Sequence, residues 1–295
     1  MMQEALRPTL AAAVFLLMLG VGMGCTARDL RKSSSRPGLI GVVTVVQFLC
    51  IPALMLGVVQ LLDLSVMHAT ALLLIGACPS GTISNAFTFL ARGNTSLSVT
   101  LTAISNVIGF LATPLALAGI GRFAGGAIAE TLNFPPGPLL KQLVLSMLLP
   151  LSLGLIIRHY YSAYILGKIK LIRRCCAVLI FAVVALIISA DPAATWTQLK
   201  ALWVPVLLIT PLLFALAWAV TAFLRLSKGE RRAILFELPC RNVALAMLIA
   251  LSVLERSDLA YVTLSFFMLE TAMILILTGA MNRFAPCELE TSEAP

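Results

Sequence analysis

The fold is decided by residues 78–106, which read CPSGTISNAFTFLARGNTSLSVTLTAISN. This stretch begins in an apolar run long enough to cross a membrane as a helix, but Pro79 and Gly81 interrupt that helix at its middle. The break frees backbone N–H and C=O groups that are costly in hydrocarbon, so it is tolerated only where it lines a cavity inside a protein. A second break lies at residues 236–246, FELPCRNVALA. Together the breaks predict an all-α polytopic membrane protein with two discontinuous helices.

The composition of the 295-residue chain agrees with this prediction. Hydrophobic residues make up 60% of the chain and charged residues 12%, whereas a soluble domain has about 45–50% and about 25%. In such a protein the net charge of +8 indicates cytoplasmic loops, so we expect membrane lipid and not nucleic acid as a partner. The seven cysteines form no C-x-x-C pair, which argues against a disulfide framework or a zinc site.

Cutting the apolar runs at charged or Pro/Gly-rich loops gives about nine transmembrane helices. They are expected at residues 9–27, 38–62, 68–91, 95–117, 137–157, 171–190, 199–223, 231–254 and 258–281. Loops after the odd-numbered spans hold fifteen of the 21 Lys and Arg residues, and the opposite side holds five. This bias predicts a multi-pass protein of the cell (inner or plasma) membrane, with its N-terminus outside and its C-terminus in the cytoplasm.

The two broken spans also indicate an internal repeat within a single membrane domain, residues 1–295. Residues 136–285 form five spans with the fourth one broken, and residues 1–135 form the same unit without its first helix. An odd number of spans separates the breaks, so the broken helices run in opposite directions, as in an inverted repeat.

Polar residues gather at the breaks. Ser84 and Asn85 follow the first break, and Ser98 and Thr102 share one face of the next helix, so four neutral oxygens suit one hard-cation site. The half-helices that begin near Thr82 and near Asn242 point positive dipole ends at the membrane centre, which favours an anionic substrate.

Three ionisable side chains lie at membrane depth and are expected to face inward: Glu237, Arg241 and Glu270. A structural ion pair between Arg241 and one of the carboxylates is as good an explanation of Arg241 as a direct contact with substrate. For Glu237, which is next to the second break, cation coordination is the favoured role.

With these residues assembled, the chain resembles the bile acid:sodium symporter family, whose members are secondary transporters with crossed discontinuous helices. The resemblance rests on Gly76 to Pro114, on VVQFLCIP at 45–52, on FELPCRNVALA and on GVGMG at 20–24. It implies one sodium site on five residues: Ser84, Asn85, Ser98, Thr102 and Glu237. It implies a second sodium site in which Gln47 matches one ligand, but Arg241 stands where the family has a second Gln.

This departure leaves three possibilities. Arg241 replaces the second cation, so that one Na⁺ remains coupled and brings the intramembrane charge of Glu237, Glu270 and Arg241 to zero. Alternatively, Arg241 binds a substrate carboxylate. In the third possibility it pairs with Glu237, and sodium dependence is replaced by the titration of Glu237 or Glu270.

The resemblance further implies a small organic anion of the bile-acid or carboxylate class as substrate. Thr82 and Asn242 match positions that face the substrate, and Ile83 and Val243 offer N–H groups of the half-helices. Thr271, one residue after Glu270, and Arg241 are further candidates.

Other functions remain open at this point. They are a sodium-independent or proton-coupled organic-anion transporter, and an arsenite-efflux-type transporter, for which Cys78 and Cys240 would be relevant. A membrane enzyme is not expected, because no His or Asp lies in the middle of a span. A sensor or scaffold would tolerate polar-to-Ala changes at the breaks, whereas a transporter would not.

Overall fold

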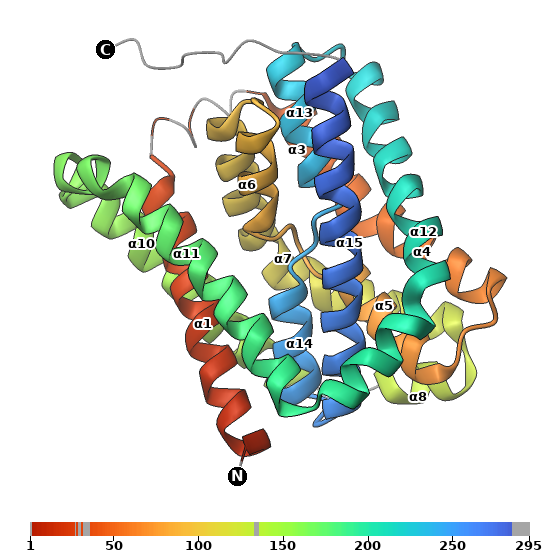
Figure 1. Ribbon diagram of the computed structural model, residues 1–295. Coiled ribbons are helices and arrows are strands. Elements are labelled where there is room, and N and C mark those ends of the chain that lie inside the picture. The colour runs from red at the N-terminus through yellow and green to blue at the C-terminus, as the bar shows by residue number, and fades with distance from the viewer. Residues whose placement is uncertain (1, 27, 29–30, 32–35, 133–135, 285–295) are drawn as a thin grey trace.

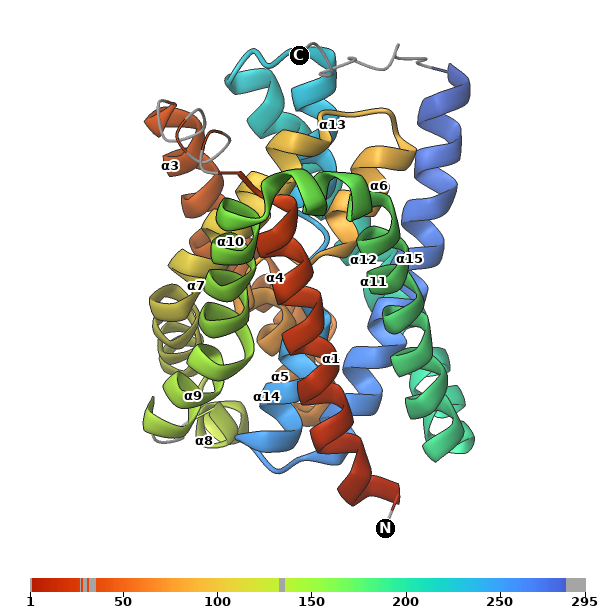
Figure 2. The same ribbon diagram turned by 90° about the vertical axis from the view of Figure 1, so that its left-hand side faces the viewer.

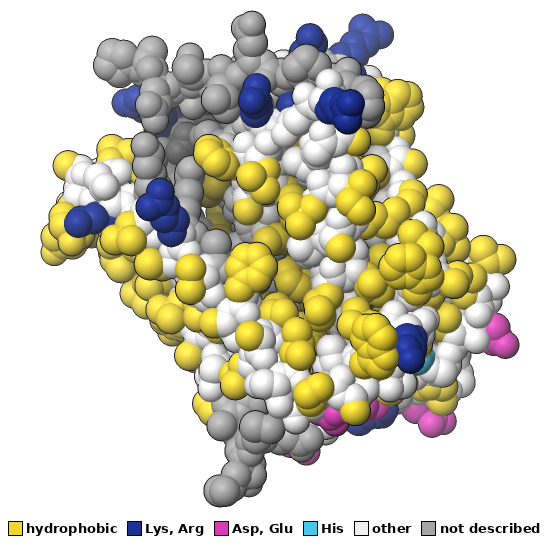
Figure 3. All heavy atoms as spheres, in the orientation of Figure 1, with side chains coloured by type: hydrophobic (Ala, Val, Ile, Leu, Met, Phe, Trp, Pro, Cys, Tyr) yellow, Lys and Arg dark blue, Asp and Glu magenta, His cyan; other side chains and the backbone are white. Residues whose placement is uncertain are grey.

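Six helical segments in the computed structural model are long and apolar enough to cross a membrane, and a bent pair of helices raises the number to seven. The structure describes residues 2–26, 28, 31, 36–132 and 136–284. Large hydrophobic side chains are widely exposed on its outer surface, among them Leu115, Phe123 and Ile276, which are each more than 70% exposed. Figure 3 shows hydrophobic side chains over the middle of one face. The protein is therefore an all-helical, multi-pass membrane protein.

The elements of the described part run along the chain as follows (Figure 1): α1 (Met2–Gly24), α3 (Pro37–Val45), η1 (Val46–Cys50), α4 (Ile51–Leu61), α5 (Val66–Ala77), α6 (Ile83–Leu90), α7 (Thr95–Ala124), α8 (Gly126–Leu132), α9 (Pro136–Leu143), η2 (Val144–Leu148), α10 (Leu149–Tyr160), α11 (Ser162–Ala190), α12 (Pro192–Phe223), α13 (Lys228–Glu237), α14 (Val243–Ser252) and α15 (Ser257–Phe284).

Two pairs of short helices are the expected discontinuous helices. The first pair is α5 and α6 and the second is α13 and α14, and in each pair a few non-helical residues replace the middle turn. The non-helical residues of the two pairs meet through an antiparallel bridge between Ser80 and Arg241, as the crossing loops in Figure 2 show. Gly81 N donates to Cys240 O at 2.9 Å and Asn242 N donates to Pro79 O at 2.8 Å. Backbone groups freed by one break are thus satisfied by the other.

Gly81 is required at this crossing because the two chains approach closely. A Cβ atom at this position would lie 2.7 Å from Arg241 O, which is nearer than a carbon and an oxygen can pack. The prediction of a break at Pro79 and Gly81 is confirmed, and its cause is now visible as the contact with the second break.

Two helices widen into π-helical turns just before a proline. The turn η1 precedes Pro52 and the turn η2 precedes Pro150, each by two residues. A proline lacks an N–H group and its ring clashes with the carbonyl four residues earlier, and a wider turn relieves that clash without breaking the helix. Both turns lie within spans that were expected to be regular helices, 38–62 and 137–157.

Helix α11 differs most from the expected span of 171–190. It begins at Ser162, and its segments Ser162–Ile169 and Arg174–Ala190 are bent by 58° relative to each other. The expected start at residue 171 is wrong because Lys168 and the basic residues that follow it, among them Arg174, lower the hydropathy around the bend. Helix α12 likewise begins before the expected residue 199, because Asp191 caps its N-terminus by accepting from Ala194 N at 2.8 Å.

Around the crossing, α1 lies between α10 and α11 on one side and α14 on the other (Figures 1 and 2). The contact between α1 and α10 uses two glycines that nearly touch. A Cβ atom on Gly22 would lie 2.3 Å from Leu151 O, and one on Gly154 would lie 2.4 Å from Leu19 O. The helices α7 and α15 contact the two broken pairs from the other directions.

Candidate functional site

A cluster of oxygen atoms surrounds the fully buried carboxylate of Glu237 at the end of α13. Ser84 Oγ from α6 donates to Glu237 Oε2 at 2.9 Å. From α7, Thr102 Oγ1 lies 2.9 Å from Oε1, and Ser98 Oγ lies 3.2 Å from Oε2. Asn85 Oδ1 accepts from Ser98 Oγ at 2.8 Å. The structure therefore brings together all five residues that the sequence assigned to a sodium site.

This cluster has more hydrogen-bond acceptors than protons. The three hydroxyl groups of Ser84, Ser98 and Thr102 supply one proton each. Those protons face both carboxylate oxygens of Glu237, the side-chain oxygen of Asn85, and the carbonyl oxygens of Gly81 and Ser98. A hard cation suits such a group of oxygens, because each hydroxyl can turn its lone pairs toward the ion.

The assigned site left out two hydroxyl groups, those of Ser80, which hydrogen-bonds the carboxylate of Glu237, and of Thr88. Thr88 Oγ1 donates to Ser98 Oγ at 3.2 Å, and the side chain of Thr88 is fully buried. Thr88 is four residues after Ser84, so it lies on the same face of α6. That spacing was the available signal for its inclusion.

The side chain of Arg241 lies among main-chain oxygens at the crossing. Its Nη2 atom donates to Gln47 O at 3.0 Å, to Gly76 O at 3.0 Å and to Cys78 O. These carbonyls come from η1 and from the end of α5, and Arg241 is 1% exposed. A positive charge thus occupies a cage of carbonyl oxygens of the kind that also coordinates metal cations.

Arg241 forms no ion pair with either buried carboxylate. Among the described residues, no nitrogen of Arg241 lies within 4.0 Å of a carboxylate oxygen of Glu237 or Glu270. Glu270, on α15, is 3% exposed, and its Oε1 atom has no hydrogen-bond partner. Gln47 is also fully buried, with both polar side-chain atoms unpaired. The ion-pair explanation of Arg241 therefore finds no support in the geometry.

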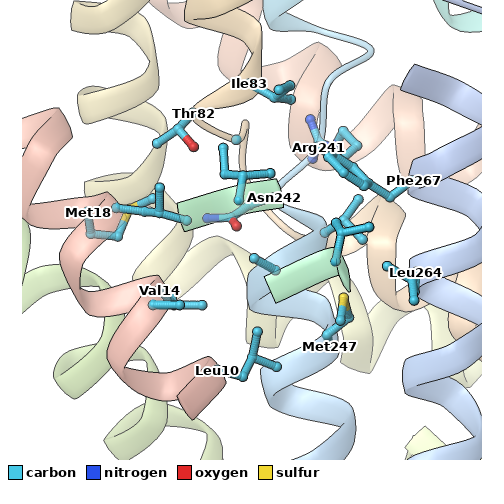
Figure 4. Close-up of a pocket in the computed structure, with 17 residues that line it drawn as sticks. Leu10, Val14, Met18, Thr82, Ile83, Arg241, Asn242, Met247, Leu264 and Phe267 are labelled. Atoms are coloured by element: carbon cyan, nitrogen blue, oxygen red, sulfur yellow. The ribbon is translucent and has the colours of Figure 1, made fainter. Parts of the chain in front are cut away.

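A cavity of about 50 Å³ opens beside the crossing. Figure 4 shows Thr82 and Asn242 opposite the α1 side chains Val14 and Met18. Five of the six residues predicted to contact substrate line this cavity: Thr82, Ile83, Arg241, Asn242 and Val243. Thr271 is not among the lining residues, so its role stays a prediction without support from the geometry.

The polar wall of the cavity consists of hydrogen-bond donors. The half-helices α6 and α14 begin at Ile83 and Val243, beside the expected positions, and their N-termini face the cavity. Asn242 Oδ1 caps α14 by accepting from Leu245 N at 3.1 Å, which leaves Asn242 Nδ2 without a partner although the residue is 4% exposed. The opposite wall is apolar and includes Leu10, Met247, Leu264 and Phe267. The cavity suits the anionic end of a molecule that also has an apolar part.

Comparison with protein families identifies this chain over most of its length. Residues 11–197 match the family described as the Sodium Bile acid symporter family. Among curated proteins, the chain is 26% identical over 235 residues to the "Uncharacterized sodium-dependent transporter YocS" of Bacillus subtilis (strain 168), covering 80% of this chain and 71% of that protein.

Two further relatives are eukaryotic. The chain is 34% identical over 147 residues to the "Probable sodium/metabolite cotransporter BASS1, chloroplastic" of Arabidopsis thaliana, covering 50% of this chain and 35% of that protein. It is 26% identical over 250 residues to the "Sodium/bile acid cotransporter 4" of Rattus norvegicus, covering 83% of this chain and 56% of that protein. The chain thus spans little more than half of the rat protein and about a third of the plant protein.

Proposed function

This chain belongs to the sodium bile acid symporter family, a family of transporters and not of enzymes, and we propose that it couples one sodium ion to the movement of a small organic anion. The observation that carries the proposal is the oxygen cluster around Glu237, where acceptors outnumber protons. Membership of this family also argues against the arsenite-efflux alternative.

The proposed sodium site consists of Glu237 with Ser84, Asn85, Ser98 and Thr102. Glu237 supplies the negative charge, and the four neutral residues supply oxygens from α6 and α7. Because Glu237 belongs to the second broken helix and Ser84 to the first, an ion bound here would join the two half-helices. Sodium would then favour the arrangement of the crossing that also forms the cavity.

In the proposed mechanism, Arg241 takes the place of a second sodium ion. Its Nη2 atom contacts three carbonyl oxygens that would otherwise be free to coordinate a second ion, and Gln47 is the one side chain retained from the second sodium site that the family resemblance implies. One Na⁺ with Arg241 balances Glu237 and Glu270, so the membrane interior carries no net charge from these groups. Glu270 would serve as the counter-charge of Arg241 without forming a direct pair.

The substrate is proposed to be an organic anion with an apolar part. Its anionic group would accept from Asn242 Nδ2 and from the N–H groups at the start of α6, where Thr82 and Ile83 donate no hydrogen bond within the described part of the chain. The cavity of about 50 Å³ is much smaller than the ~300–1,000 Å³ of most ligand pockets. Substrate entry therefore requires α1 and α11 to move away from the crossing.

The proposed architecture is that of the sequence analysis: nine transmembrane elements in one domain, with residues 1–135 and 136–285 as inverted repeats. The seven candidate spans and the two discontinuous pairs support the number. Lys and Arg side chains gather toward one end of the bundle in Figure 3, which supports the proposal that this end faces the cytoplasm. We propose, as the loop charges suggest, that the C-terminus is also cytoplasmic.

The function is tested by uptake into proteoliposomes with a panel of radiolabelled carboxylates, from short acids to bile acids. An inward sodium gradient should drive accumulation of at least one of them, and a potassium gradient should not. Asn242→Leu should abolish the uptake, whereas Gln60→Leu, which removes an exposed amide from α4, should not. Accumulation driven equally by potassium would refute sodium coupling, and accumulation driven only by a pH gradient would favour the proton-coupled alternative.

A further inference from the structure

A second and larger hollow, of about 510 Å³, lies where α1 and α10 end. Its polar side consists of Thr26, Arg28, Arg158, His159, Tyr160 and Ser162. It shares no residue with the cavity at the crossing. The proposed transport mechanism therefore gives it no role.

The hollow contains a buried positive charge that has no counter-charge among the residues that the structure describes. Arg158 is 7% exposed, and its Nη1 atom donates to Ser162 O at 3.3 Å. Its Nε atom has no hydrogen-bond partner, and no carboxylate lies within 4.0 Å of it among the described residues. None of the residues that line the hollow is acidic, and Arg28, four residues after the end of α1, adds a second guanidinium. A buried arginine that lacks a counter-ion is a site for an anion.

The depth of the hollow matches the headgroup region of a bilayer. Helix α10 ends at Tyr160, and three tyrosines at its end and at the start of α11 point outward: Tyr160, Tyr161 and Tyr164 are 75%, 64% and 67% exposed. Exposed tyrosines gather at the boundary between lipid and water. Leu155 and Ile156 also line the hollow, and Ile156 is 52% exposed, so an apolar surface continues from the basic groups toward the membrane.

We propose that this hollow binds the phosphate-containing headgroup of an anionic phospholipid. The phosphate contacts the guanidinium groups of Arg158 and Arg28, and the acyl chains extend over Leu155 and Ile156. A free phosphate would satisfy the arginines but not the apolar surface beside them. Because residues just after α1 and residues of α10 both line the hollow, a bound lipid would stabilise the contact between these two helices.

The proposal is tested with purified full-length protein in detergent micelles. The melting temperature is measured while phosphatidylglycerol or phosphatidylcholine is titrated in, at fixed sodium concentration. Phosphatidylglycerol should raise the melting temperature saturably and phosphatidylcholine should not. Arg158→Gln should weaken the apparent affinity for phosphatidylglycerol about tenfold, the effect of losing one charge-assisted hydrogen bond.

Two further variants keep the test informative if Arg158→Gln does not fold. Arg28→Gln changes an exposed residue of the hollow and should also weaken the effect. Arg225→Gln removes an exposed arginine between α12 and α13 and should leave the effect unchanged. Equal effects in all three variants, or equal stabilisation by phosphatidylcholine, would overturn the proposal. Stabilisation by millimolar potassium phosphate over potassium chloride that Arg28→Gln removes would assign the site to a free phosphate compound instead.

Discussion

Replacing Arg241 with glutamine should raise the number of bound sodium ions from one to two. The change restores an amide where the guanidinium now fills a cage made by the carbonyls of Gln47, Gly76 and Cys78. Without the positive charge, these oxygens and the unpaired side chain of Gln47 become available to a second ion. The conservative variant Arg241→Lys keeps the charge and should keep the number at one.

The loss of stability expected for Arg241→Gln follows from the contacts of Arg241 Nη2. This atom carries two protons, so two of its three carbonyl contacts can be full hydrogen bonds, and a hydrogen bond to a charged group contributes about 1.5–3 kcal/mol. Arg241→Gln therefore removes about 3–6 kcal/mol of interaction, offset in part because a buried charge no longer has to be desolvated. A second sodium ion at 100 times its Kd would restore about 2.7 kcal/mol. The variant should consequently be much less stable than the parent without sodium, and should recover most of the difference with it.

The assay is equilibrium binding of radioactive sodium to the purified protein, with the melting temperature recorded on the same samples. The buried Arg232, which donates to Ala91 O and Asn282 Oδ1, offers a matched control, and Arg232→Gln should bind one ion per chain. Two ions bound by the parent, or one ion bound by a folded Arg241→Gln protein, would refute the replacement of a cation by Arg241.

Two further predictions concern stability. Gly154→Ala places a Cβ atom 2.4 Å from Leu19 O and should lower the melting temperature by an amount that corresponds to about 1–3 kcal/mol. The control Gly57→Ala, whose Cβ would have no atom within 4 Å, should leave the melting temperature unchanged or raise it. Equal effects of the two variants would contradict the close contact of α1 with α10. Partial burial raises the pKa of Glu230, but hydrogen bonds from Arg36 and from the helix cap outweigh this effect and hold the pKa below its ordinary value. The pair of Arg36 and Glu230 therefore contributes up to about 1 kcal/mol to the free energy of unfolding above pH ~4.3. This contribution is lost as the pH falls through the lowered pKa. The difference in melting temperature between the parent and Glu230→Gln should therefore shrink between about pH 6 and about pH 3, and a difference that grows would show the opposite sign.

The positions of the two breaks could be predicted from the sequence because they depend on local chemistry. Pro79, Gly81 and Pro239 disfavour a helix and stand beside polar residues at the middle of apolar runs, and the structure has no helix at any of them. Ser98 and Thr102 could be paired because they are four residues apart on one helix, whereas Glu237 joined them, Ser84 and Asn85 only through the family resemblance. The start of α14 was also predictable from local chemistry, since Asn242 caps it.

Other features depend on contacts between distant segments and could not be predicted. The carbonyl cage of Arg241 is formed by backbone atoms of η1 and α5, and a sequence says nothing about where a carbonyl points. Hydropathy alone also failed for α11, because the helix continues through basic residues that an apolar window reads as a loop. The hollow beside Arg158 forms only when α1 packs on α10, so no local sequence pattern predicts it.

The most direct test of the sodium site is the melting temperature of the purified protein in NaCl and in choline chloride at constant ionic strength, for the parent and for Glu237→Ala. It needs no knowledge of the substrate. A saturable rise that is specific to sodium and absent from Glu237→Ala is the result predicted here. The same melting temperature in both salts, or an equal rise in the variant, would contradict a cation site at the oxygen cluster around Glu237.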